Sequence, residues 1–202
     1  MRELYRVGNA QSIGFGQIQS NYFASYAGGE ECLLALADGT IDHINGRRCA
    51  ILAVEACMRE YLEMPVQTRL PDFFHTVAAK ILYDMHEILY LGKTPYLSLA
   101  CQLIRNGTLF YYQAGSCQMF LYDGMQYRIL TGTSGSEKME KGMVAGIVSD
   151  GICKALHEKD MISCLSGNLH PYDKAQRMIL KVKEKNRKTA GNATVVCAER
   201  CL

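Results

Sequence analysis

Two aspartates stand at the ends of apolar segments, where their carboxylates can share a hard cation. Asp38 ends the continuous apolar run 32–37, Asp150 follows a similar run over 143–148, and a glycine comes directly after each acid. Carboxylate oxygens suit Mg²⁺ and Mn²⁺, and a glycine leaves room for a carbonyl or a water. Each Asp-Gly pair taken alone also fits an ordinary turn. Together, on two buried strands, they form a candidate metal site.

Composition places the chain among ordinary globular proteins. Its 202 residues are 49% hydrophobic and 21% charged, so we expect one domain over residues 1–202. A net charge of +2 argues against a nucleic-acid partner. No apolar run approaches the roughly 20 residues that cross a bilayer, and the first residues lack a signal-peptide pattern. We therefore expect a cytoplasmic protein with no membrane partner.

The nine cysteines do not indicate a disulfide framework or a zinc site. They include no Cys-x-x-Cys pair, and their number is odd. Without a secretory signal, this usage is typical of reduced, mostly buried thiols.

The hydrophobic pattern predicts strands first, then two helices, more strands, a helical region and a final strand. This segregation favours an α+β fold over alternating βαβ units. Strands are expected over 12–18, 21–26, 32–37, 97–103, 109–112, 119–122, 127–130, 143–148 and 192–198. Helices are expected from 47 onward, from 71 to near 92, and over 172–188. The polar, Gly/Ser-rich segment 131–142 is expected to be a loop.

Four segments, in order, resemble those of the PP2C-type (PPM family) metal-dependent serine/threonine protein phosphatases. Residues 37–50 resemble the Ala-Asp-Gly-x-Gly-Gly-His signature that leads into a helix. Residues 113–121 resemble the Gly-Asp-Ser-Arg strand, and 142–151 resemble the segment that ends in Ser-Asp-Gly. Residues 192–196 resemble the terminal Asp-Asn-x-Thr-x-Val strand. The resemblance covers nearly the whole chain.

This resemblance implies a β-sandwich with helix pairs flanking the two sheets and, in this chain, a shortened flap region. It also implies that two Mn²⁺ or Mg²⁺ ions activate a water that attacks phosphoserine or phosphothreonine. When the family's ligands are carried over by position, the resemblance implies that Asp38 bridges the two ions and that the Gly39 carbonyl helps to bind the second ion. Asp150 holds the first ion. Asp38 and Asp150 are thus both the metal ligands and the candidate catalytic residues.

The chain departs from the family pattern where the pattern supplies charge. The family's phosphate-binding arginine corresponds to Gly16, and its first acidic motif corresponds to 19–21, which reads Gln-Ser-Asn. Its last metal aspartate corresponds to Gly191, and the aspartate of the Gly-Asp-Ser-Arg strand corresponds to Ser116. Asp42 is a possible local replacement. We therefore expect at most one weakly held Mn²⁺ or Mg²⁺, and a degenerate member of the family.

The motif matches and the missing charged residues together leave two functions open. The first is a weak or inactive pseudophosphatase that works as a binding or regulatory module for a phosphorylated or signalling protein. The alternative is an active Mn²⁺- or Mg²⁺-dependent phosphatase with a reduced site. A third reading is an unrelated sandwich whose motif matches arose by chance. His43 is a candidate for contact with a phosphate or a metal-bound water, and its alternative is a surface histidine. The basic run 181–188 fits an acidic partner or a solvated helix face.

Overall fold

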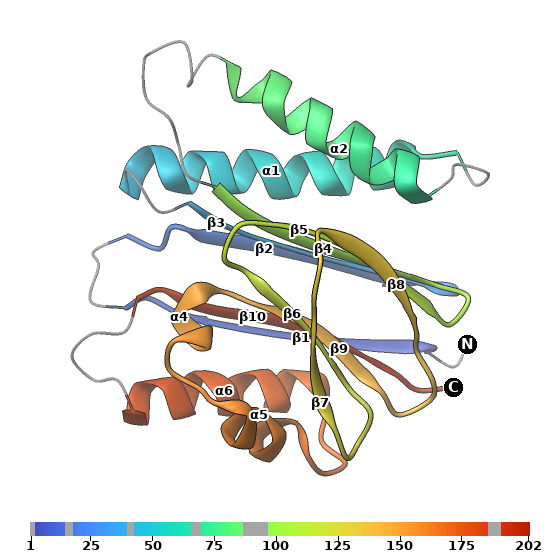
Figure 1. Cartoon of the computed structure of the whole chain (residues 1–202), viewed down its shortest axis with the longest axis vertical. Helices are drawn as coiled ribbons and strands as arrows, with labels where there is room; N and C mark the ends of the chain where they lie inside the picture. The colour runs from blue at the N-terminus through green and yellow to red at the C-terminus, as the bar shows by residue number, and fades with distance from the viewer. Residues whose placement is uncertain (1–2, 15–17, 40–42, 66–69, 87–96, 186–190) are drawn as a thin grey trace.

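The computed structural model describes residues 3–14, 18–39, 43–65, 70–86, 97–185 and 191–202. Two five-stranded antiparallel sheets pack face to face, with helices on both outer sides (Figure 1). The first sheet has the order β1 (Tyr5–Ser12), β10 (Ala193–Arg200), β9 (Val144–Val148), β6 (Gln118–Tyr122) and β7 (Tyr127–Leu130). The second has the order β2 (Asn21–Gly28), β3 (Glu31–Gly39), β4 (Leu97–Arg105), β5 (Thr108–Ala114) and β8 (Ser134–Lys138).

Helices cover the outer face of each sheet, as expected for an α+β sandwich. On the second sheet lie α1 (His43–Glu63) and α2 (Leu70–Asp84). On the first sheet lie α4 (Asp150–Cys153), α5 (Glu158–Leu165) and α6 (Pro171–Lys185). Both chain ends lie at one end of the sandwich, whereas α4 lies at the other (Figure 1).

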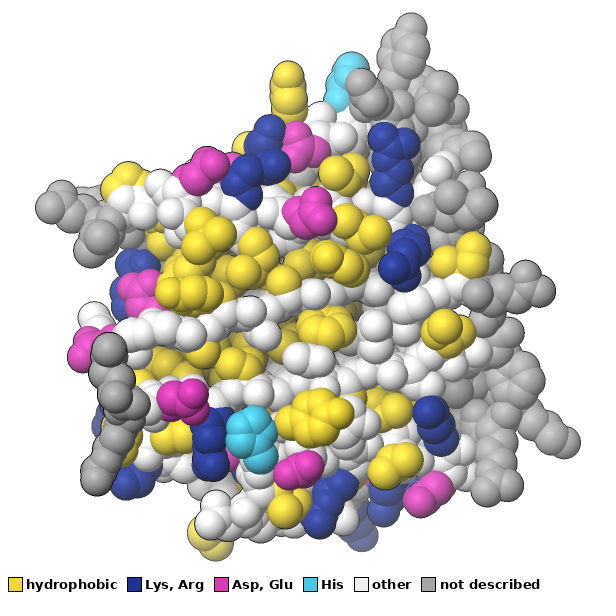
Figure 2. Space-filling view, turned by 180° about the vertical axis from the view of Figure 1, so that it is seen from behind, with side chains coloured by type: hydrophobic (Ala, Val, Ile, Leu, Met, Phe, Trp, Pro, Cys, Tyr) yellow, Lys and Arg dark blue, Asp and Glu magenta, His cyan; other side chains and the backbone are white. Residues whose placement is uncertain are grey.

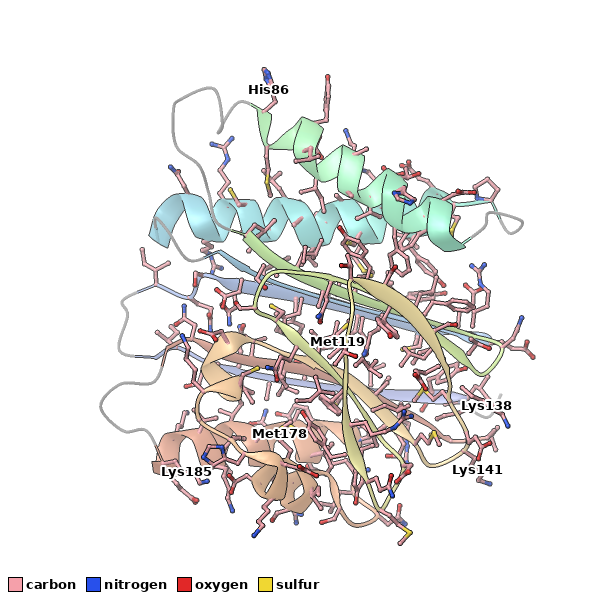
Figure 3. The ribbon with its side chains drawn as sticks, in the orientation of Figure 1. His86, Met119, Lys138, Lys141, Met178 and Lys185 are labelled. Carbon is pink, nitrogen blue, oxygen red and sulfur yellow. The ribbon has the colours of Figure 1, made fainter. Side chains whose placement is uncertain are left out.

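Three apolar layers hold these elements together. One lies between the sheets, one under α1 and α2, and one under α4 to α6. Met119 of β6 belongs to the layer between the sheets, and Met178 of α6 belongs to the layer beneath that helix (Figure 3). Both methionines are fully buried.

Burial on both faces explains the continuous apolar sequence of β3. Successive side chains of a strand point to opposite faces, so a strand covered on both faces needs apolar residues at every position. Leu33 and Ala35 belong to the layer beneath α1, whereas Leu34 and Leu36 belong to the layer between the sheets. The strand therefore carries Asp38 to one end of the sandwich on a rigid support.

Most expected elements form, and two expectations are wrong. The first strand is β1, Tyr5–Ser12, so a strand over 12–18 is incorrect; residues 15–17 lie outside the described part. The expected loop over 131–142 contains the edge strand β8, which pairs with Thr108–Tyr112 of β5. Both are edge strands of mixed or polar sequence, so neither has the apolar pattern that identifies a strand from sequence.

Charged side chains of both signs are interspersed on the face in Figure 2, and no area of a single sign dominates it. Within the described residues, none of the helices combines the length and the apolar character that crossing a membrane requires.

A glycine–glycine contact fixes the end of β3 against the start of α1. A Cβ placed on Gly39 would overlap the Gly46 carbonyl, and a Cβ on Gly46 would overlap the Gly39 carbonyl. Backbone therefore meets backbone here, directly beside Asp38.

We predict that Gly39→Ala lowers the free energy of unfolding by about 2–3 kcal/mol, because neither backbone can yield without moving the strand or the helix. Gly191→Ala is the matched control, since its added Cβ meets nothing within 4 Å; its effect should stay within about 0.5 kcal/mol. Urea denaturation measures both. Equal stability of the two variants would contradict the tight contact.

Candidate metal centre

The centre of the site is Asp38, the next-to-last residue of β3. In the sheet register it lies between Asn21 of β2 and Ser98 of β4, and all three residues are buried. The Ser98 hydroxyl accepts a hydrogen bond of 2.6 Å from the Cys117 backbone N–H. This bond ties the entry to β6 to the strand beside Asp38.

The Asp38 carboxylate is held in a poorly solvated position. Asp38 is only 4% exposed. Burial first, and then the nearby Asp150 carboxylate, raise the pKa of Asp38 from 3.8 to about 6, although Ser20 and Lys154 oppose the rise. The Ser20 Oγ lies 3.5 Å from the Asp38 Oδ1, a long and weak contact. At neutral pH the site therefore contains a mostly ionised acid whose burial is only partly offset.

Asp150 lies on the first sheet's side of the site, as the first residue of α4. Its Oδ2 pairs with the Nζ of Lys154 at 2.5 Å, one helical turn further along the chain. The hydrogen bond and charge of Asp150, and more distantly the charge of Asp38, raise the pKa of Lys154. Among the described residues, Lys154 is thus a cation that acts on both acids of the site.

Amide and hydroxyl groups join the two sheets beside these acids. The Asn192 Nδ2 donates to the Ile18 carbonyl at 3.0 Å and to the Ser20 Oγ at 2.9 Å. The backbone carbonyl of Asn192 accepts hydrogen bonds from the Ser149 Oγ at 3.1 Å and from the Asn21 Nδ2 at 3.3 Å. Neutral hydrogen bonds therefore bridge the region between Asp38 and Asp150.

One oxygen beside this bridge has no hydrogen-bond partner among the described residues. The Asn21 Nδ2 also donates to the Thr194 Oγ1 at 3.0 Å, but the buried Asn21 Oδ1 accepts no hydrogen bond from the described part of the chain. A buried acceptor left unpaired is costly, and a cation or a water is the partner that would satisfy it.

The structure brings together the predicted ligands Asp38 and Asp150, which interact electrostatically across the site. Gly39 lies beside Asp38 at the end of β3. His43 begins α1, but its side chain lies outside the described residues, as do Gly16 and Asp42 entirely. The roles of these residues as ligands remain predictions.

Two thiols and one arginine near the site were not singled out from the sequence. Cys117 is buried, Cys153 is half-buried, and both interact with the Asp150 charge. Burial raises the pKa of Cys153 to about 12, so it stays a neutral thiol. The Arg47 Nη1 donates to the Gln19 carbonyl at 2.6 Å and so holds the segment that leads into β2. No sequence signal marked the cysteines, since neither has ligand-like spacing.

Within the described ranges, no group of three or more His, Cys, Asp or Glu side chains is arranged to hold a metal ion. The described side-chain oxygens of the site include the two carboxylates, the orphaned Asn21 Oδ1 and the Ser20 hydroxyl.

Comparison with known proteins gives the fold. No protein-family model and no curated protein sequence matches the chain. Among solved structures, a Streptococcus agalactiae serine/threonine phosphatase aligns with a TM-score of 0.83 at 15% identity, covering 96% of this chain and 99% of that one. The catalytic domain of the serine/threonine phosphatase PstP, solved with two manganese ions, aligns with a TM-score of 0.85 at 17% identity over 100% of both chains.

A third similar structure is PppA of Pseudomonas aeruginosa, described as a key regulatory component of a type VI secretion system. It aligns with a TM-score of 0.80 at 15% identity, over 96% of this chain and 97% of that one. The chain therefore has the fold of PP2C-type serine/threonine phosphatases, as the resemblance implied. At these identities the comparison establishes the fold and leaves the activity to the site.

The pKa of Asp38 predicts how stability depends on pH. Because the folded-state pKa is raised, the native protein binds this proton more tightly than the unfolded chain. The cost of the ionised group is absent below pH 4, grows as the pH rises to about 6, and is complete above that value.

We therefore predict that Asp38→Asn raises the free energy of unfolding by about 2 kcal/mol at pH 7.5 in EDTA, with little effect at pH 4. Asp123→Asn is the control. Backbone N–H groups lower the pKa of Asp123, so its ionised form stabilises the fold and the substitution should lower the free energy of unfolding at pH 7.5. Denaturation at several pH values measures both. A wild type more stable than Asp38→Asn at pH 7.5 would show that the ionised Asp38 carboxylate does not destabilise the fold.

Proposed function

We propose that this chain is a PP2C-like protein with an eroded metal site, which acts as a binding or regulatory module rather than as an efficient phosphatase. The observation that carries the proposal is the state of its two acids. Asp150 is paired with Lys154, and Asp38 is buried with a raised pKa. We propose a phosphorylated or signalling protein as its partner.

Charge arithmetic supports this proposal. Two divalent ions carry four positive charges, which a site must offset largely with carboxylates. The described part of the site offers Asp38 and Asp150, and a lysine already neutralises one of them. At the positions where the resemblance expects further acids, the chain has Ser20, Asn21 and Gly191.

These residues do not fit a two-ion centre. Hydroxyl and amide oxygens can complete the shell of an ion, but they add no charge, and the Asn192 amide is already committed to hydrogen bonds. The unpaired Asn21 Oδ1 leaves one neutral oxygen for a cation near Asp38. We accordingly expect at most one weakly held Mn²⁺ or Mg²⁺, and we derive no catalytic step through it.

The alternative function is a metal-dependent phosphatase with a reduced site. The observation that favours it is the retention of Asp38 in a costly, buried, ionised state, together with the unsatisfied oxygen of Asn21. Strained groups of this kind often mark functional sites. In this reading Asp38 and Asp150 would be the metal ligands and the catalytic residues, and the substrate would be a phosphoserine or phosphothreonine protein.

Phosphate release from a phosphothreonine peptide in millimolar Mn²⁺ or Mg²⁺ separates the two functions. We expect the wild type to release no more phosphate than Asp38→Asn and Asp150→Asn, since its site lacks the charge to hold two ions. Circular dichroism should confirm that all three proteins are folded. Metal-dependent turnover that both substitutions abolish would overturn the proposal in favour of the active enzyme.

Restoring a carboxylate should restore metal binding if charge is what the site lacks. Gly191 precedes the Asn192 bridge, and a Cβ added there meets nothing within 4 Å, so Gly191→Asp places an acid at an open position. We expect it to tighten Mn²⁺ binding by about tenfold, a typical worth for one added charged ligand. Gly191→Asn is the isosteric control. Isothermal titration measures both, and equal affinities for the two variants would argue against a charge deficit.

A further inference from the structure

The Lys154–Asp150 pair lies where the chain's own charge and a bound cation would compete. The two residues are four positions apart, on α4 and directly after it, and the Nζ–Oδ2 distance of 2.5 Å indicates a direct ion pair. The Lys154 side chain is 75% exposed, whereas the Asp150 side chain is 31% exposed. The lysine thus approaches the acid from the solvent side.

Lys154 also interacts electrostatically with Asp38. Its charge stabilises ionised Asp38, and the charge of Asp38 in turn favours protonated Lys154. The Asp150 carboxylate contacts this ammonium directly, and the Asp38 carboxylate acts on it at longer range. A single positive charge therefore offsets part of the repulsion between two acids that the fold holds near each other.

We infer that Lys154 is the resident cation of this site: its ammonium occupies the Asp150 carboxylate in place of a divalent ion, and the two exclude each other. The inference rests on the proposed charge deficit and names the residue that keeps a metal away. It also gives the site two forms, one closed by Lys154 and one in which the lysine has swung into solvent and Asp150 is free.

The competition has a predictable size. A divalent ion on Asp150 must displace the ammonium and then tolerate a positive charge nearby. Because the lysine is exposed, the pair is screened and its contribution is modest. Removing the charge should therefore raise divalent-ion affinity by about three- to tenfold at low salt. The gain should shrink as salt screens the lysine.

The test is titration of the full chain with MnCl₂ by isothermal calorimetry at low ionic strength. We expect Lys154→Met to bind Mn²⁺ three- to tenfold more tightly than the wild type, and Lys154→Arg to resemble the wild type because it keeps the charge. Lys159→Met controls for net charge, since Lys159 is exposed on α5 and has no ion pair among the described residues. It should leave the affinity unchanged.

The outcomes separate this inference from the proposed function. Unchanged affinity in Lys154→Met, with weak binding throughout, would overturn the role of Lys154 and leave the eroded site standing. Equal gains in Lys154→Met and Lys159→Met would reduce the effect to net charge and would also overturn it. Tight binding of two ions by the wild type would instead overturn the proposed function itself.

Discussion

Two carboxylates held near each other at one end of a rigid sandwich are the constraint on which this site depends. The backbone fixes Asp38 at the end of β3, and Asp150 begins α4 directly after β9. Neither acid can move away without disturbing a buried strand. Their repulsion and the burial of Asp38 must be offset by something positive, and among the described groups Lys154 takes that part.

Neutral contacts hold the architecture around the two acids. The Gly39–Gly46 contact, the Ser98–Cys117 hydrogen bond and the Asn192 bridge hold the site's backbone in place. These contacts are neutral and independent of any ion. A fold held in this way keeps its shape without an ion, which the proposed binding module requires.

The sequence predicted the parts of the fold that depend on burial. The doubly covered strand β3 was predicted from its continuous apolar run. The edge strand β1 was misplaced and the edge strand β8 was missed, because backbone pairing rather than side-chain burial defines them. At the site, sequence reasoning found Asp38 and Asp150 but not Lys154. Its spacing of four residues from Asp150 is readable in a helix, yet nothing in the sequence says that this short helix borders the other acid.

The central claim, that a lysine rather than a pair of metal ions balances this site, is tested most directly by anomalous diffraction. Crystals of the wild-type chain soaked in millimolar MnCl₂ would reveal any bound manganese by its anomalous signal. The account predicts no two-ion centre between Asp38 and Asp150, with the Lys154 ammonium on Asp150. Two manganese peaks bridged by Asp38, with Lys154 displaced into solvent, would contradict it.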